Sequence, residues 1–435
     1  MNIPGTICKR CGHKWYLRRP QLPKVCPKCK SPYWNKERKR KSDRWDYQDI
    51  KYLKSKLVDN LVKRRIIKTK RVENAFRKVD RHLFVHNETL ENIYGDYSIV
   101  TKKIGVTPMS SSTSPSLMVT MLEMMVLDQD MKVLEIGTGT GYNAAILSEI
   151  VGPENVFSID IDPDTVNEAK RNLLNAGYKN IKVGLKDGAR GFPEYSPYDR
   201  IIITCSVDSI LPAWINQLKD NGIIVAPLCF NGAQITVAFK KQGEILHSVS
   251  TGLGGFMKIR KKTFEETIKK IHPSKHNDLL IVTEHPKLFN EKKTMSLLRS
   301  QPNKKNRSRN NFKAKDLDNF LVFLALYENK SVDIYPEDNV TRKYGFKRGA
   351  GIIDIEKSSG SLITNNGKLI AYGKNKKAYN QLLKHLRKWN SMGCPTIDKL
   401  KIREYYKNNP PYLRKNEVLF SRPSVKLVVR TPIKK

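Results

Sequence analysis

Between residues 130 and 230 the chain alternates short apolar segments with amphipathic ones, and no other feature restricts the fold as strongly. The apolar segments read KVLEIG, NVFSIDI, IKVGLKDG, RIIITCS and GIIVAPL, each of strand length. Strands that alternate with helices are typical of a parallel sheet covered on both faces. The pattern predicts a doubly wound, Rossmann-like α/β sheet, and the strand-like text from 231 to 262 indicates an antiparallel pair at its end.

Three glycines, Gly137, Gly139 and Gly141, stand in the segment KVLEIGTGTGYNAAIL between an apolar strand and a helix. Glycine lets the backbone turn sharply and approach a ligand closely, because it has no Cβ. Nicotinamide sites and S-adenosylmethionine sites both use such a turn. The triplet alone therefore predicts a cofactor site without naming the cofactor.

Acidic residues at three strand ends favour S-adenosylmethionine. Glu135 precedes the glycine turn, where a carboxylate can face the cationic amino-acid end of this cofactor. Asp160 ends the next strand, where a carboxylate can accept hydrogen bonds from both ribose hydroxyls. Asp187 and Gly188 end the third strand, beside the expected adenine. A dinucleotide site more often has GxGxxG and does not need the third acid, so the pattern predicts a methyltransferase.

Four of the seven cysteines lie within the first 29 residues, as two CxxC pairs. Two such pairs can deliver four thiolates to one tetrahedral ion. With no open coordination position left, the metal is expected to be structural zinc in a zinc ribbon. The expected ligands are Cys8, Cys11, Cys26 and Cys29.

Positive charge is concentrated outside the central segment. The chain has a formal net charge of +38, and residues 1–46 carry 14 Lys/Arg against 3 Asp/Glu, whereas residues 119–230 carry 9 against 15. Such an excess suits a nucleic-acid partner of the ribbon and the flanks, although it is equally compatible with general surface charge. The aromatic residues of the ribbon can likewise stack on bases or complete a small core.

No apolar run approaches the roughly 20 residues that span a bilayer, and the first residues lack the apolar core of a secretory signal. We therefore expect no membrane partner and a cytoplasmic location.

From about residue 95 to 230 the chain resembles the protein-L-isoaspartate O-methyltransferases. The resemblance is carried by VLEIGTGTGYNAAILSEIVG, GLKDGARGFPEYSPYDRIIITCSV and ILPAWINQLKDNGIIVAPL. It implies methylation of the carboxylate of isoaspartyl (D-aspartyl) residues in damaged proteins or peptides, which initiates repair.

The family places a hydroxyl-bearing loop of the form TISxP ahead of the glycine motif. The matching text here is SSSTSP, which puts Ser111 beside the cofactor and Thr113 where the family has its active serine. The threonine keeps the hydroxyl and adds a methyl group. Either the role survives, or the pocket is retuned toward another carboxylate. The segment 254–262, GGFMKIRKK, only loosely fits a family strand that helps hold the substrate.

The sequence is also compatible with other acceptors of the methyl group. The acceptor can be a normal aspartyl residue, or a nucleic acid guided by the ribbon. The NPPY text at 409–412 matches amino-group methyltransferases, but it stands far downstream of the fourth strand, where that motif works. A third alternative is a nucleic-acid-binding protein that has lost its activity.

Five regions are expected along the chain. They are a zinc ribbon at 1–35, a basic linker and helical segment at 36–92, a methyltransferase domain at 93–262, a helical or flexible junction at 263–316, and a basic C-terminal α+β extension at 317–435.

Overall fold

A computed structural model describes most of the chain and all of the segment expected to form the glycine turn. The described residues are 5–9, 13–16, 23–28, 35, 46–104, 107–259, 269–271, 279–283, 289–307, 312–336, 344–406 and 412–432.

The expected parallel sheet is present. Strand β5 (Val133–Ile136) lies between β6 (Val156–Asp160) and β8 (Tyr198–Ile203), β7 (Lys182–Leu185) pairs with β6, and β9 (Leu218–Phe230) pairs with β8, all in parallel. The strand order reverses at β5, where a doubly wound sheet opens a crevice at its carboxyl edge. Helices α4 (Pro115–Met125), α5 (Tyr142–Val151), α6 (Pro163–Asn175) and α7 (Pro212–Gln217) belong to this region.

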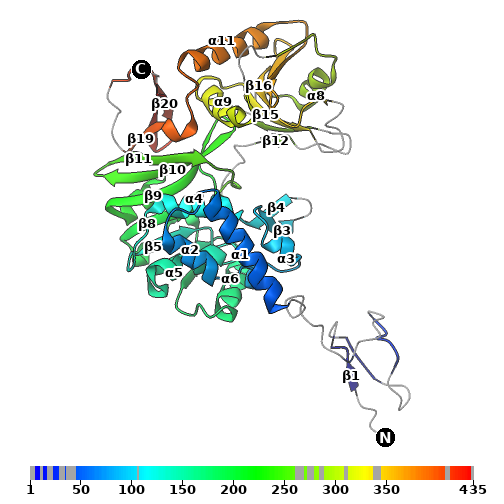
Figure 1. The fold of residues 1–435 in the computed structure, drawn as a ribbon, viewed down its shortest axis with the longest axis vertical. Coiled ribbons are helices and arrows are strands. Elements are labelled where there is room, and N and C mark those ends of the chain that lie inside the picture. Colours follow the sequence, from blue (N-terminus) through cyan, green and yellow to red (C-terminus); the bar gives the residue numbers. More distant parts are fainter. Residues whose placement is uncertain are drawn as a thin grey trace.

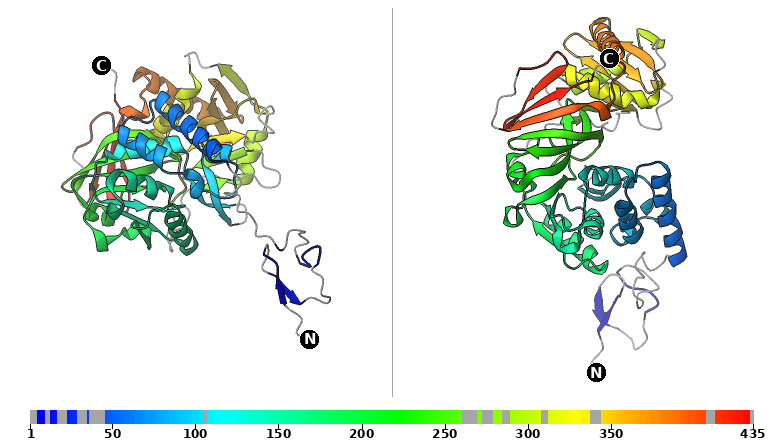
Figure 2. Two further views of the ribbon diagram at one scale, coloured as in Figure 1. Left: turned by 60° about the horizontal axis from the view of Figure 1, so that its bottom comes forward. Right: turned by 60° about the vertical axis from the view of Figure 1, so that its left-hand side comes forward.

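Five antiparallel strands extend the sheet beyond β9. They are β10 (Ala233–Gln242), β11 (Ile245–Leu253), β19 (Lys401–Tyr406), β21 (Val425–Arg430) and β20 (Glu417–Ser421), in that spatial order. The antiparallel pair expected after residue 231 is thus present, but it is not the end of the sheet. Its outer edge is paired with a strand from near the C-terminus, as Figure 2 shows.

The helices before the sheet pack into the same core as the glycine turn, whereas the sequence pattern set 36–92 apart as a linker and helical segment. They are α1 (Tyr47–Lys63), α2 (Lys70–Lys78), the short 3-10 helix η2 (Arg81–Leu83) and α3 (Leu90–Ile93). Buried side chains of α1 and α2, including Leu61 and Phe76, join Ala144 and Ile146 of α5 in one cluster. The helices expected in this stretch are therefore present and their apolar face packs on the methyltransferase region, whereas residues 36–45, the expected linker, lie outside the described residues.

A second sheet forms the C-terminal domain. In order it contains β12 (Lys269–Ile271), β13 (Leu279–Thr283), β15 (Ser331–Pro336), β16 (Gly349–Asp354), β17 (Ser359–Thr364), β18 (Lys368–Tyr372) and β14 (Lys304–Arg307). Its helices are α8 (Glu291–Arg299), α9 (Ala314–Tyr327) and α11 (Lys377–Ser391). The stretch 263–316, expected to be a junction, therefore supplies three strands and a helix to this domain.

Helix α9 joins the two sheets (Figure 1). It contacts β9 and β10 on one side and β15 and β16 on the other. Its residues 320–326 are all buried, as expected for a helix that is covered all round. Because one apolar cluster contains both Ile235 of β10 and Phe320 of α9, the two domains share a core.

The N-terminal segment contains a short antiparallel pair, β1 (Gly5–Ile7) with β2 (Lys14–Tyr16). In the described part of the chain, no helix has the length and apolar character needed to cross a membrane.

Candidate active site

The glycine turn connects β5 to α5 and is tied to the end of β6. The amides of Gly137 and Thr138 donate to the carbonyl of Ile159 at 2.8 and 3.1 Å. Gly137, Gly139 and Gly141 all have positive φ, of 106°, 53° and 88°. A Cβ on Gly137 would also collide with Thr204 Oγ1. Backbone conformation and lack of space thus both require glycine at Gly137.

Glu135 lies beneath the turn and is completely buried. Its carboxylate accepts hydrogen bonds from Asn143 Nδ2 at 2.8 Å and Ser158 Oγ at 2.5 Å. Burial raises the pKa of Glu135 to about 7, against the lowering effect of these two bonds. Sequence reasoning missed Asn143 and Ser158, which lie on α5 and β6 and look like ordinary core positions.

Asp160 ends β6 and faces the same turn. Its carboxylate accepts from the amides of Gly139 and Asp162, each at 3.2 Å. These bonds hold the carboxylate at the carboxyl edge of the sheet, beside the glycines.

Asp187 lies differently from Asp160. One of its oxygens accepts from the amide of Ala189 at 3.0 Å and caps the 3-10 helix η4 (Gly188–Arg190). The neighbouring Gly188 packs closely on β5, because a Cβ there would come within 2.8 Å of Ile136 Cγ2. The acid expected beside adenine is therefore engaged in its own turn through one oxygen.

The hydroxyl-bearing text begins in the last residues of β4 (Thr107–Ser112), which pairs with β3 (Ile99–Ile104), and continues into the loop after it. Ser111 and Thr113 are both partly exposed there. Arg81 holds the loop from behind: its Nη2 donates to Ser112 Oγ at 3.2 Å and to the Thr113 carbonyl at 3.0 Å. The same guanidinium donates to the Ile93 carbonyl at 2.9 Å, although the residue is completely buried.

Sequence reasoning missed Arg81. The residue lies in the text KVDRHLF, where an arginine looks like one of many surface cations. Burial lowers the pKa of this guanidinium, so the bonds to backbone carbonyls offset a real desolvation cost.

One cavity of about 520 Å³ brings most of the expected residues together. Ser111, Thr113, Glu135, Gly137, Gly139, Asp160 and Gly188 all line it. Gly141 and Asp187 are described residues that do not line it; Gly141 caps the start of α5, and a Cβ there would face Leu173 of α6.

The segment 253–259 crosses this cavity, although it matched the family pattern only loosely. It is held by Ser206, whose amide donates to the Met257 carbonyl at 2.8 Å and whose carbonyl accepts from Ile259 at 2.9 Å.

The side of the cavity away from the glycine turn is formed by the C-terminal domain. We call this side the far wall. It consists of Val282 on β13, Asp318, Leu321 and Val322 on α9, Asp333 and Tyr335 on β15, and Arg348 just before β16.

The expected metal site is only partly described, because Cys11 and Cys29 lie outside the described residues. Cys8 and Cys26 are both completely buried and pack with Trp15 in one small cluster. The Cys8 amide donates to the His13 carbonyl at 2.9 Å, which closes the turn between β1 and β2. Among the residues with described positions, no group of three or more potential ligands is assembled.

Comparison with known proteins gives the same family as the motifs. Residues 52–253 match the family described as Protein-L-isoaspartate(D-aspartate) O-methyltransferase (PCMT). A protein-L-isoaspartate O-methyltransferase of Pyrococcus horikoshii is 42% identical over 171 residues, which are 39% of this chain and 75% of the relative. One from Ignicoccus hospitalis is 39% identical over 176 residues, which are 40% of this chain and 81% of the relative.

Among solved structures, a protein-L-isoaspartate O-methyltransferase aligns with a TM-score of 0.47 and 24% identity, covering 82% of this chain and 97% of that one.

Proposed function

Because this chain belongs to the protein-L-isoaspartate O-methyltransferase family, we propose that the cavity beside its glycine turn is the site of its reaction. The enzyme uses S-adenosyl-L-methionine to methylate the carboxylate of L-isoaspartyl (D-aspartyl) residues in damaged proteins, which initiates their repair. The observation that carries the placement of the reaction is that Thr113, Gly139 and Asp160 line a single cavity.

Four groups hold the cofactor in this proposal. Asp160 accepts from the ribose hydroxyls, and its position at the carboxyl edge of β6 supports this role. Glu135 attracts the cationic amino-acid end, and the backbone of the glycine turn, with Ser111 opposite, encloses the rest. Gly188 lines the adenine end, with Asp187 beside it.

The acceptor needs orientation more than activation. A carboxylate is already ionised near neutral pH, so no general base is required. S-adenosyl-L-methionine supplies a methyl group bound to a positively charged sulfur. Thr113 donates a hydrogen bond that orients the acceptor carboxylate, and Arg81 fixes the loop that carries Thr113. In-line positioning and exclusion of water then lower the barrier.

Labelled methyl donor tests this function when it is offered separately to an isoaspartyl peptide, the matching aspartyl peptide and tRNA. We expect base-labile label on the isoaspartyl peptide. Label on the aspartyl peptide alone would identify a retuned acceptor site around Thr113. Base-stable label on RNA would refute carboxyl methylation. The first three residues of the NPPY text, 409–411, lie outside the described residues, and no role in the reaction is proposed for this text.

The zinc ribbon at 1–35 is a further part of the proposal. It is supported by two cysteines, one from each CxxC pair, that are buried together, and by the closed turn between β1 and β2. Four thiolates would fill a tetrahedral zinc ion and leave it structural. Metal analysis should find one zinc per chain, and Cys26→Ser should remove it; zinc-free wild-type protein would refute the site.

The basic ribbon and flanks are proposed to contact nucleic acid, and the cytoplasm is proposed as the location. Trp15, however, packs against the buried cysteines, which favours a core role over base stacking for this ring. Binding of tRNA that weakens steeply with salt would support the contact, whereas no binding at low salt would exclude it.

A further inference from the structure

The far wall lies in the reaction cavity but outside the segment 52–253 that matches the family. Its residues come from β13, α9, β15 and the position just before β16, and they line the cavity that Thr113 and Gly139 also line. A peptide whose carboxylate reaches Thr113 occupies the same cavity that these residues line, so its neighbouring residues can contact them. The C-terminal domain is therefore positioned to contact the substrate.

Four polar residues of the far wall form one rigid cluster. Arg348 donates from Nε to Asp333 Oδ1 at 3.0 Å and from Nη2 to Asp333 Oδ2 at 2.8 Å. Its Nη1 lies 2.5 Å from Asp318 Oδ1 on α9. Tyr335 completes the cluster by donating to Asp333 Oδ2 at 2.6 Å. Bidentate pairing fixes these side chains before any ligand arrives.

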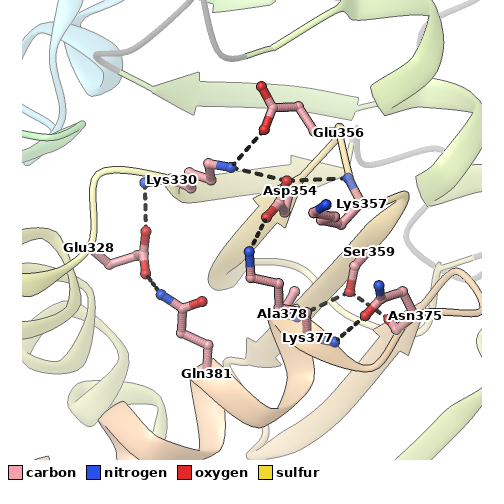
Figure 3. A network of polar contacts seen from close by, with 10 residues as sticks. All are labelled: Glu328, Lys330, Asp354, Glu356, Lys357, Ser359, Asn375, Lys377, Ala378 and Gln381. Atoms are coloured by element: carbon pink, nitrogen blue, oxygen red, sulfur yellow. Dashed lines mark hydrogen bonds and ion pairs between the residues drawn. The ribbon is translucent and has the colours of Figure 1, made fainter.

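A second polar network in the same domain lies outside the reaction cavity (Figure 3). There, Lys330 Nζ lies 3.0 Å from Asp354 Oδ1, and the side chain of Asp354 is only 5% exposed. None of the ten residues drawn lines the reaction cavity. By contrast, Asp318 and Arg348 do line it, and their side chains are 28% and 25% exposed. The far-wall cluster thus keeps polar surface facing the space where substrate binds.

The charge of the far wall is negative, because two carboxylates, Asp318 and Asp333, face one guanidinium, Arg348. A fixed negative charge attracts a cationic side chain and repels an anionic one over several ångströms. The effect is moderate because the cluster is partly exposed to solvent and therefore screened.

We propose that the far wall is a substrate subsite that binds the peptide flanking the isoaspartyl residue and selects basic flanking side chains over acidic ones. This inference rests on the proposed function, since it assumes that a peptide carboxylate occupies the cavity. It makes Asp318 a specificity-determining residue contributed by the C-terminal domain.

Equilibrium binding separates this inference from turnover. Full-length protein saturated with S-adenosyl-L-homocysteine is titrated into two fluorescent isoaspartyl peptides, one with flanking lysines and one with flanking glutamates. The wild type should bind the lysine peptide more tightly. Asp318→Asn keeps the shape of the side chain and should reduce the ratio of the two dissociation constants about threefold. Arg348→Gln removes the compensating cation and should raise the ratio by a similar factor.

Asp398→Asn is the matched control, because Asp398 is 61% exposed and does not line the cavity. It should leave the ratio unchanged. If Asp318→Asn does the same, the inference is wrong, and it is equally wrong if wild type binds neither peptide. If Arg348→Gln fails to fold, the ratio of dissociation constants measured for Asp318→Asn is sufficient to test the inference. A wild type that binds with the basic preference but transfers no methyl group refutes the repair function and leaves the far wall as a peptide-binding surface.

Discussion

The glycine-turn side of the reaction cavity and its far wall are built in opposite ways. The turn is made from residues close together in the chain, mainly between Glu135 and Asp160, and it relies on backbone hydrogen bonds and positive φ angles. The far wall is made from side-chain ion pairs between α9, β15 and the start of β16. In the proposed function the turn holds the cofactor, which every reaction shares, whereas the proposed subsite on the far wall contacts the peptide, which differs between substrates.

This difference predicts separable effects. Damage to the turn should reduce cofactor binding whatever the peptide. Damage to the far wall should change the choice of peptide and leave cofactor binding intact. The following substitutions test the turn side of this comparison, from the largest expected effect to the smallest.

Gly137→Ala should have the largest effect. The new Cβ would collide with Thr204 Oγ1 at a residue whose φ is 106°. Strain and overpacking together should cost about 3 kcal/mol of unfolding free energy, measured by urea denaturation. Gly243→Ala is the control, since it has a φ of 61° but nothing within 4 Å, and should cost about 1 kcal/mol. Equal losses in the two variants would mean that the close approach to Thr204 is unimportant.

Asp160→Ala should weaken binding of S-adenosyl-L-homocysteine about 100-fold, because hydrogen bonds from two ribose hydroxyls to a charged acceptor are lost. Isothermal titration calorimetry measures this change. Asp164→Ala is the control, as the Asp164 side chain is 83% exposed on α6, and it should stay within about twofold of wild type. An Asp160→Ala protein that binds normally would overturn the assigned cofactor site.

Thr113→Ala should lower kcat about tenfold with an isoaspartyl peptide and leave cofactor affinity unchanged, because one orienting hydrogen bond is lost. Thr113→Ser keeps the hydroxyl and should retain most of the activity. Single-turnover rates are the appropriate measurement. Equal rates in the alanine and serine variants would show that the hydroxyl has no role.

Glu135 should make cofactor binding depend on pH, with an effect of about fivefold. Burial raises its pKa to about 7 from the ordinary 4.5, so the carboxyl of the free protein is largely protonated at pH 6. A cationic ligand favours the ionised form, so affinity should rise between pH 6 and 8 with release of a proton.

The raised pKa of Glu135 gives the stability of the fold the opposite dependence on pH. The folded state binds the proton of Glu135 more tightly than the unfolded state does. The contribution of Glu135 to stability is therefore complete below about pH 4.5 and is lost as the pH rises to about 7. Glu135→Gln should flatten both profiles; a wild-type affinity that does not change with pH would argue against contact between Glu135 and the cationic end.

The sequence predicted the cofactor side of the cavity well because its structure is local. An apolar strand, a glycine turn and an amphipathic helix are each set by residues within a few positions of one another. The parallel strands were predicted correctly for the same reason. Asp187 shows the limit of such reasoning. A carboxylate at the end of a strand can either bind a ligand or cap the turn that follows it, and the sequence alone does not distinguish these two roles.

Other features of the fold and of the site depend on contacts between distant parts of the chain, which a local sequence pattern does not predict. Arg81 lies in a 3-10 helix before the sheet yet holds the loop of Thr113, 32 positions later. The strands β19–β21 complete a sheet that begins 268 positions earlier, at β5. The stretch expected to be a junction looked polar because its helix α8 buries one face, with Thr294, Met295 and Leu298, and exposes charged side chains on the other.

By itself, the sequence determined the order of strands and helices between residues 130 and 230, the glycine turn and the family, since these follow from local periodicity, backbone conformation and motif spacing. Only the tertiary structure decided that α9 joins two sheets and that Arg348 meets Asp318 and Asp333 at the edge of the cavity. The physical reason is that an ion pair between distant segments depends on how two apolar surfaces pack, and that packing is a property of the whole core.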